Sequence, residues 1–357
     1  MKIGIVVGTR PEIIKMAPVV RACIARDTPY LLLHTGQHYS FEMDGVFFQE
    51  LGLPVPHHNL EVGSGSQPHQ IGTIVLGMEP LLARERPDVL LVEGDTNSVL
   101  AAALTSQKMG IPVGHVEAGL RSYDRGMPEE INRILTDHLS EWLFAPTERA
   151  KQILLSEQIA PQRIHVTGNT VVDELMLQKD RAASDELFTR FGVEPGRFLL
   201  ATVHRAENTD VPERLRGIFQ GLAGSARAFG MPVLAALHPR TSSRLAALGI
   251  AVDDGVRALP PLGYLEFLGL HARAALVLTD SGGLQEEACS LRVPCVTLRD
   301  NTERPESVEV GANRLAGADP DAIVEAARAM RERPRDWPNP FGDGTSGLQI
   351  VDLLLGR

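Results

Sequence analysis

Short runs of apolar residues alternate with longer segments of mixed polarity along most of this chain. Most of the runs are apolar over their whole length, which is typical of parallel strands that are covered on both faces. The runs that predict strands are Lys2–Val7, Tyr30–Thr35, Asp88–Glu93, Pro112–Val116, Trp142–Ala145, Arg163–Thr167, Phe198–Val203, Val233–Leu237, Ala274–Thr279 and Pro294–Leu298.

The segments between these runs have the length and periodicity of helices, most clearly Pro11–Ala25, Asn97–Met109 and Pro212–Phe229. Repeated strand–helix units favour parallel sheets with right-handed crossovers. We therefore predict an α/β fold with two doubly wound, Rossmann-like domains that face each other across a cleft. Ligands of such sheets bind outside the carboxyl ends of the strands, so the cleft is the expected site.

The strand series pauses over residues 169–195, a polar helical stretch that ends in Gly-Val-Glu-Pro-Gly. We place the domain boundary there, with an N-terminal domain over residues 1–170 and a C-terminal domain over 171–345. The bend Asn339–Thr345 is rich in turn residues, and an amphipathic segment follows it. We expect this last segment, residues 346–357, to pack back on the N-terminal domain.

Composition narrows the function classes. A chain of 357 residues is long for one core, and a net charge of -10 argues against a nucleic-acid or membrane-surface partner. The three cysteines, Cys23, Cys289 and Cys295, lack metal-type spacing and indicate buried thiols in a reducing compartment. The first apolar run is too short for a signal peptide, and none approaches the ~18 residues of a membrane helix. We predict a cytoplasmic protein.

The most informative segment is TDSGGLQEEA, residues 279–288, which follows an apolar run. Ser281-Gly282-Gly283 should open a helix at the end of a strand, where unpaired N–H groups and the helix dipole suit a phosphate. Glu286 and Glu287 follow in the first turns of that helix. Either carboxylate could serve helix capping, or it could bind the hydroxyls of a ribose attached to that phosphate.

Charged residues also follow the predicted strands of the first half. Arg10 and Lys15 flank a helix start that suits an anion, although surface charge is the simpler explanation for Lys15. Asp95 could be an N-cap or a catalytic carboxylate. Glu117 lies at another strand end. Glu129 shares a helix face with Arg133, so these two could simply form a salt bridge. Three converging carboxylates would nevertheless make an acid/base set.

In the second half, His204 and Arg205 follow one predicted strand and His238 follows the next. A lone histidine is usually structural, but two at equivalent strand ends are candidates for a phosphate site. Arg304 is a further candidate for binding an anion.

Absent motifs also narrow the chemistry. The sequence has no GxGxxG after a strand, no GxxxxGK[ST] loop, no HExxH and no Cys/His cluster, so we predict neither a bound NAD nor a metal.

Taken together, the chain resembles the non-hydrolysing UDP-N-acetylglucosamine 2-epimerases, in particular their archaeal-type branch. The blocks that carry the resemblance occur in order and nearly end to end: GTRPEIIKMAP, EGDTNSVLA, HVEAGLRS, PEEINR, FAPTE, GNTVVD, HRAEN, TDSGGLQEEA, RDNTERPE and NPFGDG. The resemblance implies a two-domain fold of the glycosyltransferase-B type. It also implies interconversion of UDP-N-acetylglucosamine and UDP-N-acetylmannosamine through elimination and re-addition of UDP, with 2-acetamidoglucal as intermediate and no cofactor.

The resemblance also implies roles for individual residues. It makes Asp95, Glu117 and Glu129 the acid/base carboxylates, without deciding which removes the C2 proton. It makes Glu287 the ribose ligand, which leaves Glu286 to the capping role, and places Phe267 near the uracil. The diphosphate positions are Arg10, His204, Ser281, Gly282 and Gly283, with His204 also among the catalytic candidates, and the remaining substrate-binding positions are Lys15, Arg133, Arg205, His238 and Arg304.

Three alternatives stay open at this point. The substrate could be a modified sugar such as a UDP-2,3-diacetamido-uronic acid, the enzyme could be a glycosyltransferase on the same fold, or the protein could be an inactive sugar-nucleotide sensor. The presence of Asp95, Glu117 and Glu129 argues against the sensor. A homodimer is expected from the resemblance alone.

Overall fold

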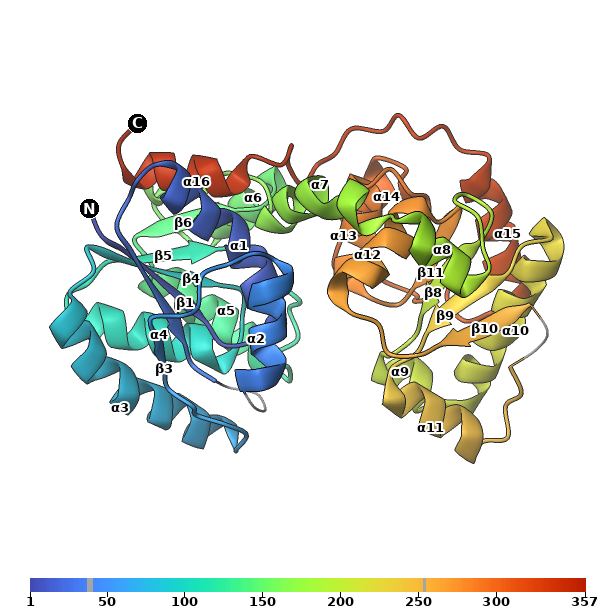
Figure 1. Cartoon of the computed structure of the whole chain (residues 1–357), viewed down its shortest axis with the longest axis horizontal. Coiled ribbons are helices and arrows are strands. Elements are labelled where there is room, and N and C mark those ends of the chain that lie inside the picture. Colours follow the sequence, from blue (N-terminus) through green and yellow to red (C-terminus); the bar gives the residue numbers. More distant parts are fainter. Residues whose placement is uncertain (37–40, 253–254) are drawn as a thin grey trace. The chain divides into compact units, whose positions relative to one another are not determined.

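The computed structural model describes residues 1–36, 41–252 and 255–357. The chain divides into two compact units (Figure 1), one formed by Met1–Glu174 with Phe341–Arg357 and one by Leu175–Pro340. Each unit has its own parallel sheet covered by helices, so the predicted α/β fold class is confirmed. The expected boundary at 170/171 falls at the start of helix α7 (Thr170–Ala182), and the units divide within that helix.

Within the described part of the first unit, seven parallel strands run in the order β3-β2-β1-β4-β5-β6-β7. The strands are β1 (Ile3–Val7), β2 (Tyr30–His34), β3 (His58–Asn59), β4 (Val89–Glu93), β5 (Val113–Val116), β6 (Trp142–Ala145) and β7 (Ile164–Val166). The helices are α1 (Arg10–Ala25), α2 (Phe41–Glu50), α3 (Gln67–Glu85), α4 (Asn97–Lys108), α5 (Pro128–Leu139), α6 (Glu148–Ser156), the first part of α7, and α16 (Ser346–Leu354).

The second unit has six strands among its described residues, all parallel, in the order β10-β9-β8-β11-β12-β13. The strands are β8 (Leu199–Thr202), β9 (Val233–Ala236), β10 (Val256–Leu259), β11 (Leu276–Thr279), β12 (Cys295–Thr297) and β13 (Asn313–Leu315). Its helices are α8 (Asp185–Phe191), α9 (Ala206–Thr209), α10 (Pro212–Phe229), α11 (Pro239–Ala247), α12 (Tyr264–Arg273), α13 (Gly282–Ser290), α14 (Pro305–Glu309) and α15 (Pro320–Arg331).

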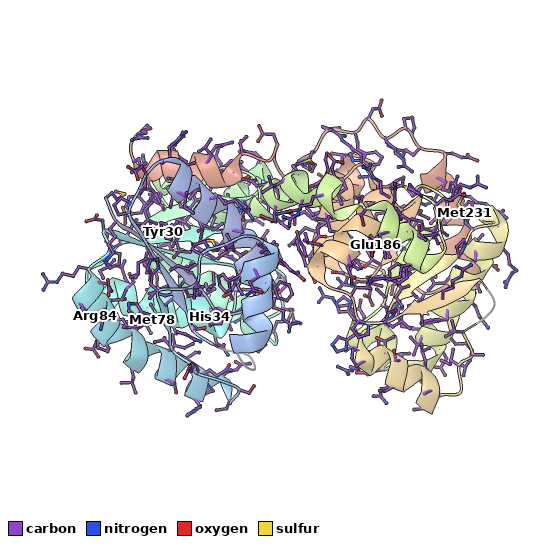
Figure 2. The ribbon with its side chains drawn as sticks, in the orientation of Figure 1. Tyr30, His34, Met78, Arg84, Glu186 and Met231 are labelled. Atoms are coloured by element: carbon purple, nitrogen blue, oxygen red, sulfur yellow. The ribbon has the colours of Figure 1, made fainter. Side chains whose placement is uncertain are left out.

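Apolar strands between two helical layers produce the cores. All five residues of β1 and of β4 are buried, as the continuous apolar runs predicted. Met78 of α3 is fully buried in the core of the first unit, whereas Arg84 near the end of the same helix is exposed (Figure 2). The helix therefore packs one face on the sheet and leaves the other to solvent.

The last helix of the chain belongs to the first unit, where α16 packs against α1. The carboxylate of Asp173 accepts the backbone N–H groups of Ser346 at 3.1 Å and Gly347 at 2.8 Å, and so satisfies the start of α16. A Cβ on Gly347 would meet the carbonyl carbon of Pro18 at 2.7 Å. Only glycine permits this close approach of the two helices.

Each sheet has one point where the strand order changes direction, between β1 and β4 in the first and between β8 and β11 in the second. Ligands of doubly wound sheets bind at the carboxyl ends of the strands at this point. The segments that leave these four strands carry Arg10, Asp95, His204 and Ser281.

Candidate active site

The turn between β1 and α1 is built around Gly8 and Glu12. A Cβ on Gly8 would lie 2.3 Å from the hydroxyl oxygens of Ser98 and Thr35, so only glycine fits there. The buried carboxylate of Glu12 accepts the N–H of Gly8 and, at 2.6 Å, the hydroxyl of Thr96. It thereby ties this turn to the one that carries Asp95. Burial raises the pKa of Glu12 to about 7 despite these hydrogen bonds.

Arg10 is the first residue of α1 and is exposed. Its guanidinium carbon lies 5.0 Å from the ring centroid of Phe47, within the range of a cation–π contact. The positive charge therefore stands at a helix N-terminus, an arrangement that suits an anion.

Lys15 is shared by two carboxylates, that of the buried Glu93 and that of Glu117, whose side chain is 8% exposed. Its Nζ lies 2.9 Å from Glu93 Oε1 and also contacts Glu117. Glu117 further accepts a hydrogen bond of 3.1 Å from the amide of Asn169. Burial raises the pKa of Glu93 well above its ordinary value, because one ammonium does not balance several carboxylates in a dry site. The pairing explains Lys15 better than surface charge does.

Glu117 is a non-glycine residue in the left-handed region, with φ 67°. Such a conformation costs of the order of 1 kcal/mol and is found most often at functional sites. His115, two residues before Glu117, fixes the position of this turn. Its Nδ1 lies 2.6 Å from Asp137 and its Nε2 lies 2.8 Å from the carbonyl oxygen of Gly94. One histidine thus links the strand end before Glu117 to the turn before Asp95.

Asp95, another carboxylate of the predicted acid/base set, pairs with Arg133 of α5 at 2.7 Å. Arg133 also donates to Glu130 at 2.9 Å. Glu130 is buried and accepts the N–H groups of Ser122 and Tyr123, each by way of a carboxylate oxygen. The salt bridge that spacing suggested for Arg133 therefore involves Asp95 and Glu130. Glu129 is exposed and has no ion pair within the part of the chain that the structure describes.

In the second unit, Asp280 is fully buried at the end of β11. Its carboxylate accepts the N–H groups of His204 at 3.0 Å and Arg205 at 2.9 Å, and it lies 3.0 Å from His204 Nδ1. Arg205 also faces Glu303 at 3.4 Å. The predicted residues His204 and Arg205 are therefore fixed to the strand that leads into the glycine turn.

The predicted phosphate-type turn has the expected strand–turn–helix form. Ser281 is the N-cap of α13, its hydroxyl 3.5 Å from the N–H of Leu284, and Gly282 begins the helix. Gly282 is buried, and Gly283 is exposed, where a Cβ would meet Ser281 Oγ at 3.9 Å. The N–H groups at this helix start can therefore approach an anion closely.

Glu286 and Glu287 lie beyond the first turn of α13, so the capping role expected for Glu286 is wrong. Glu286 is buried and binds Arg304 Nε at 2.9 Å. Glu287 lies 3.5 Å from Nδ1 of the buried His271. The ring of Phe267 lies 5.9 Å from that of His271. Glu287 and Phe267 are thus connected through one histidine on α12.

His238 is the N-cap of α11, where its Nδ1 accepts the N–H of Arg240 at 3.2 Å. This capping contact accounts for its position without a ligand.

The sequence interpretation did not select Glu12, Glu130 or Asp280. Glu12 lies in the motif whose cations, Arg10 and Lys15, predict an anion site, and Glu130 is adjacent to Glu129, the carboxylate that the resemblance favours. The signal for Asp280 was available, because a charged residue directly after a buried strand and before a glycine turn must find several hydrogen-bond donors.

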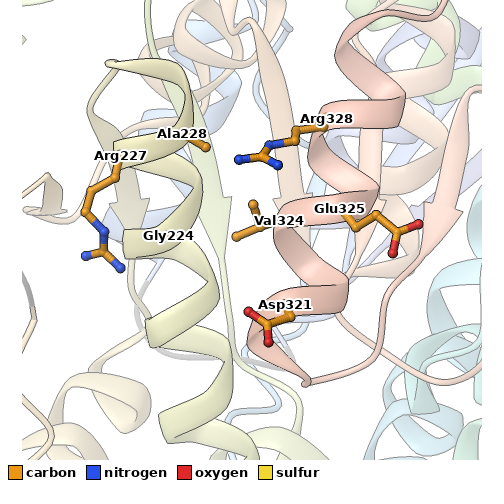
Figure 3. A pocket seen from close by; sticks show the side chains of 7 residues that line it. All are labelled: Gly224, Arg227, Ala228, Asp321, Val324, Glu325 and Arg328. Carbon is orange, nitrogen blue, oxygen red and sulfur yellow. The ribbon is translucent and has the colours of Figure 1, made fainter.

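A groove of about 560 Å³ lies between α10 and α15 (Figure 3). Two cations, Arg227 and Arg328, and two anions, Asp321 and Glu325, line it beside small side chains. It contains none of the predicted site residues. Among the described residues, no group of three or more His, Cys, Asp or Glu side chains could hold a metal, and none of the helices is long and apolar enough to cross a membrane.

Comparisons with known proteins identify the family of this chain. A family model described as UDP-N-acetylglucosamine 2-epimerase matches residues 22–355. The UDP-N-acetylglucosamine 2-epimerase of Methanocaldococcus jannaschii is 49% identical, with 99% of each chain covered. A UDP-2,3-diacetamido-2,3-dideoxy-D-glucuronate 2-epimerase of Pseudomonas aeruginosa is 41% identical, again with 99% of each chain covered.

Solved structures give the same answer. The M. jannaschii UDP-GlcNAc 2-epimerase in complex with UDP-GlcNAc and UDP aligns over 100% of both chains, with a TM-score of 0.87 and 48% identity. A glycosyltransferase from Rickettsia africae has a TM-score of 0.60 at 12% identity, which shows a shared fold alone. The chain therefore belongs to the UDP-N-acetylglucosamine 2-epimerase family.

Proposed function

We propose that this protein interconverts UDP-N-acetylglucosamine and UDP-N-acetylmannosamine by eliminating UDP across C1–C2 and adding it back. The observation that carries the proposal is the placement of two chemically different sets of residues at the two switch points. Carboxylates paired with Lys15 and Arg133 lie at one of them. A glycine-opened helix N-terminus beside His204 lies at the other.

The chemistry requires both sets. The C2 proton is not adjacent to a carbonyl group, so its direct removal would be very costly. When a carboxylate takes that proton, the C–H electron pair becomes the C1=C2 double bond, and the C1–O pair leaves with UDP. The departing diphosphate gains negative charge, which N–H donors and cations stabilise. Addition of UDP with the proton delivered to the opposite face gives the epimer.

We assign the proton transfer to Asp95, Glu117 and Glu129, with Lys15 and Arg133 as their partners. Glu117, which Asn169 and Lys15 bind, and ion-paired Asp95 are the better supported, because their contacts hold them at strand ends. Ser281, Gly282, Gly283, His204 and Arg10 are assigned to the diphosphate, Glu287 to the ribose and Phe267 to the uracil. Arg205 and Arg304 are further substrate-binding candidates. His238 is kept as a substrate-binding candidate beside its capping role.

One experiment tests the proposal. The protein is incubated with UDP-N-acetylglucosamine in D2O and followed by proton NMR. We expect UDP-N-acetylmannosamine with deuterium at C2. Free N-acetylmannosamine with UDP would mean hydrolysis. Turnover of a UDP-2,3-diacetamido-uronic acid in place of UDP-N-acetylglucosamine would move the assignment to the modified sugar, and epimerisation without deuterium would contradict proton abstraction.

We further propose a homodimer in the cytoplasm. The three cysteines are buried free thiols, in agreement with a reducing compartment. Light scattering of the purified protein tests the dimer, because a mass of 38.8 kDa would correspond to the monomer.

A further inference from the structure

His204 and Asp280 form a couple at the switch point of the second sheet. Their strands, β8 and β11, are direct neighbours. His204 is 42% exposed at its side chain, whereas that of Asp280 is fully buried. The two meet through His204 Nδ1 and Asp280 Oδ1 at 3.0 Å.

Every partner of the Asp280 carboxylate is a hydrogen-bond donor. The backbone N–H groups of His204 and Arg205 donate at 3.0 and 2.9 Å, and the amide of Asn208 donates at 3.1 Å. Burial alone would raise the pKa of Asp280, but His204 and these donors hold it below its ordinary value. The carboxylate is therefore ionised at neutral pH and acts as an acceptor toward all of its neighbours.

An acceptor opposite Nδ1 means that Nδ1 carries a proton. In the part of the chain that the structure describes, His204 Nε2 has no hydrogen-bond partner. His115 in the first unit differs from His204 in this respect. Its Nδ1 faces Asp137 and its Nε2 faces a backbone carbonyl, so both ring nitrogens have a hydrogen-bond partner within the protein. His115 is built as a structural link, and His204 is built with one nitrogen open to a ligand.

We propose that Asp280 is a positioning residue that holds His204 in its Nδ1–H form and reserves Nε2 for the diphosphate of the substrate. This inference rests on the proposed function, in which UDP leaves C1. As the C1–O bond breaks, its electron pair passes to the β-phosphate oxygen, while the C2 proton goes to a first-unit carboxylate. Nε2 can donate to that oxygen once it has bound a proton from solvent, which makes the ring an imidazolium with N–H groups at both nitrogens. The Asp280 carboxylate at Nδ1 stabilises the positive charge of this imidazolium.

The first test needs only the unmodified protein. Nitrogen-15 NMR of histidine-labelled protein at alkaline pH distinguishes the two neutral tautomers, and the signals of His204 are identified by their loss in His204→Gln. We expect the Nδ1–H tautomer for His204. The Nε2–H tautomer, which free histidine prefers, would overturn the proposal.

The second test replaces Asp280 by asparagine. The amide oxygen can still accept backbone N–H groups, but its NH2 group then faces Nδ1 and forces the ring into the Nε2–H form. We expect an inverted tautomer, and we expect kcat to fall about a hundredfold with a smaller change in KM, because no carboxylate is left to stabilise the imidazolium while UDP departs. An unchanged tautomer and kcat would contradict the inference. Should Asp280→Asn fail to fold, the tautomer of the unmodified protein still decides.

Asp319→Asn is the matched control. Asp319 caps α15 by accepting the N–H of Ala322 at 2.9 Å, and asparagine can cap equally well. This variant should retain the tautomer of His204 and normal turnover. If the unmodified protein has the Nδ1–H tautomer but does not epimerise, the positioning of His204 is supported and the proposed function fails. If it epimerises with the other tautomer, the inference about Asp280 fails by itself.

Discussion

At the residue scale, the buried carboxylates differ in what surrounds them, and this difference sets their charge. Asp280 has a histidine and several N–H donors, and its pKa lies below the ordinary value. Glu12 has a backbone N–H and a threonine hydroxyl, and its pKa is about 7. Neutral donors alone do not overcome the desolvation of an ionised carboxylate.

The raised pKa of Glu12 predicts a pH-dependent stability. The unfolded chain releases the Glu12 proton near pH 4.5, whereas the folded protein keeps it until about pH 7. The free energy of unfolding therefore falls as pH rises through this window, by about 3 kcal/mol from this residue. Glu12→Gln removes that loss, so its stability relative to the parent should increase between pH 4.5 and 8. Urea titrations of both proteins at several pH values measure this, and parallel curves would contradict it.

Glu117→Gln tests the acid/base assignment. The amide has nearly the same shape but cannot take the C2 proton, so turnover should fall about a hundredfold or more, and Asp95→Asn should behave alike. UDP binding should persist, because all of its proposed ligands except Arg10 lie in the other unit. Initial rates and calorimetric UDP titrations separate the two effects. Glu141→Gln, an exposed glutamate of the same unit, is the control. Near-normal rates in Glu117→Gln would remove this residue from the mechanism.

The sequence predicted the placement of Asp95, Glu117 and His204 after strands, because a strongly apolar run precedes each of them, and the structure has them there. Their roles in the reaction stay predictions. The sequence did not reveal which of two adjacent carboxylates, Glu129 or Glu130, binds Arg133. Spacing paired Arg133 with Glu129, but Glu130 faces Arg133 and the turn at Ser122, and Glu129 is exposed. The orientation of a helix decides which of two neighbours is buried, and local spacing does not carry that information.

At the element scale, the strands that the pattern missed are β3, β10 and β13, which all lie at sheet edges. An edge strand is less completely covered, so it lacks the continuous apolar run by which central strands are recognised. In β10, for example, Arg257 and Ala258 are exposed. Since the edges are far from the switch points, these omissions left the candidate site unaffected.

The contact between α16 and α1 gives a prediction of its own. In Gly347→Ala the new methyl group would lie 2.7 Å from the Pro18 carbonyl carbon, and backbone must move to accept it. We expect a loss of about 1–3 kcal/mol in the free energy of unfolding. Gly72→Ala in α3, where no atom lies within 4 Å of the new methyl group, should instead stabilise by about 0.5–1 kcal/mol. Chemical denaturation measures both, and equal effects would show that α16 does not pack as described.

At the scale of the whole molecule, the two sheets share one plan, with the order reversing next to the first strand of each unit. Hydrogen exchange tests the assignment of UDP binding to the second unit. With saturating UDP, we expect slower exchange in the segments after β8 and β11, because bound ligand stabilises the N–H groups it contacts. Smaller effects are expected near Arg10. Slower exchange confined to the first unit would contradict the assignment of UDP to the second.

The return of residues 341–357 to the first unit has a consequence for synthesis on the ribosome. The second unit is one continuous stretch, Leu175–Pro340, and all of it precedes α16. The first unit lacks α16 and its contact with α1 until residues 341–357 emerge. Proteins commonly complete their N-terminal domain first during translation. Here the order of completion is reversed: a nascent chain that has left the ribosome as far as Pro340 holds all of the second unit and a first unit without α16.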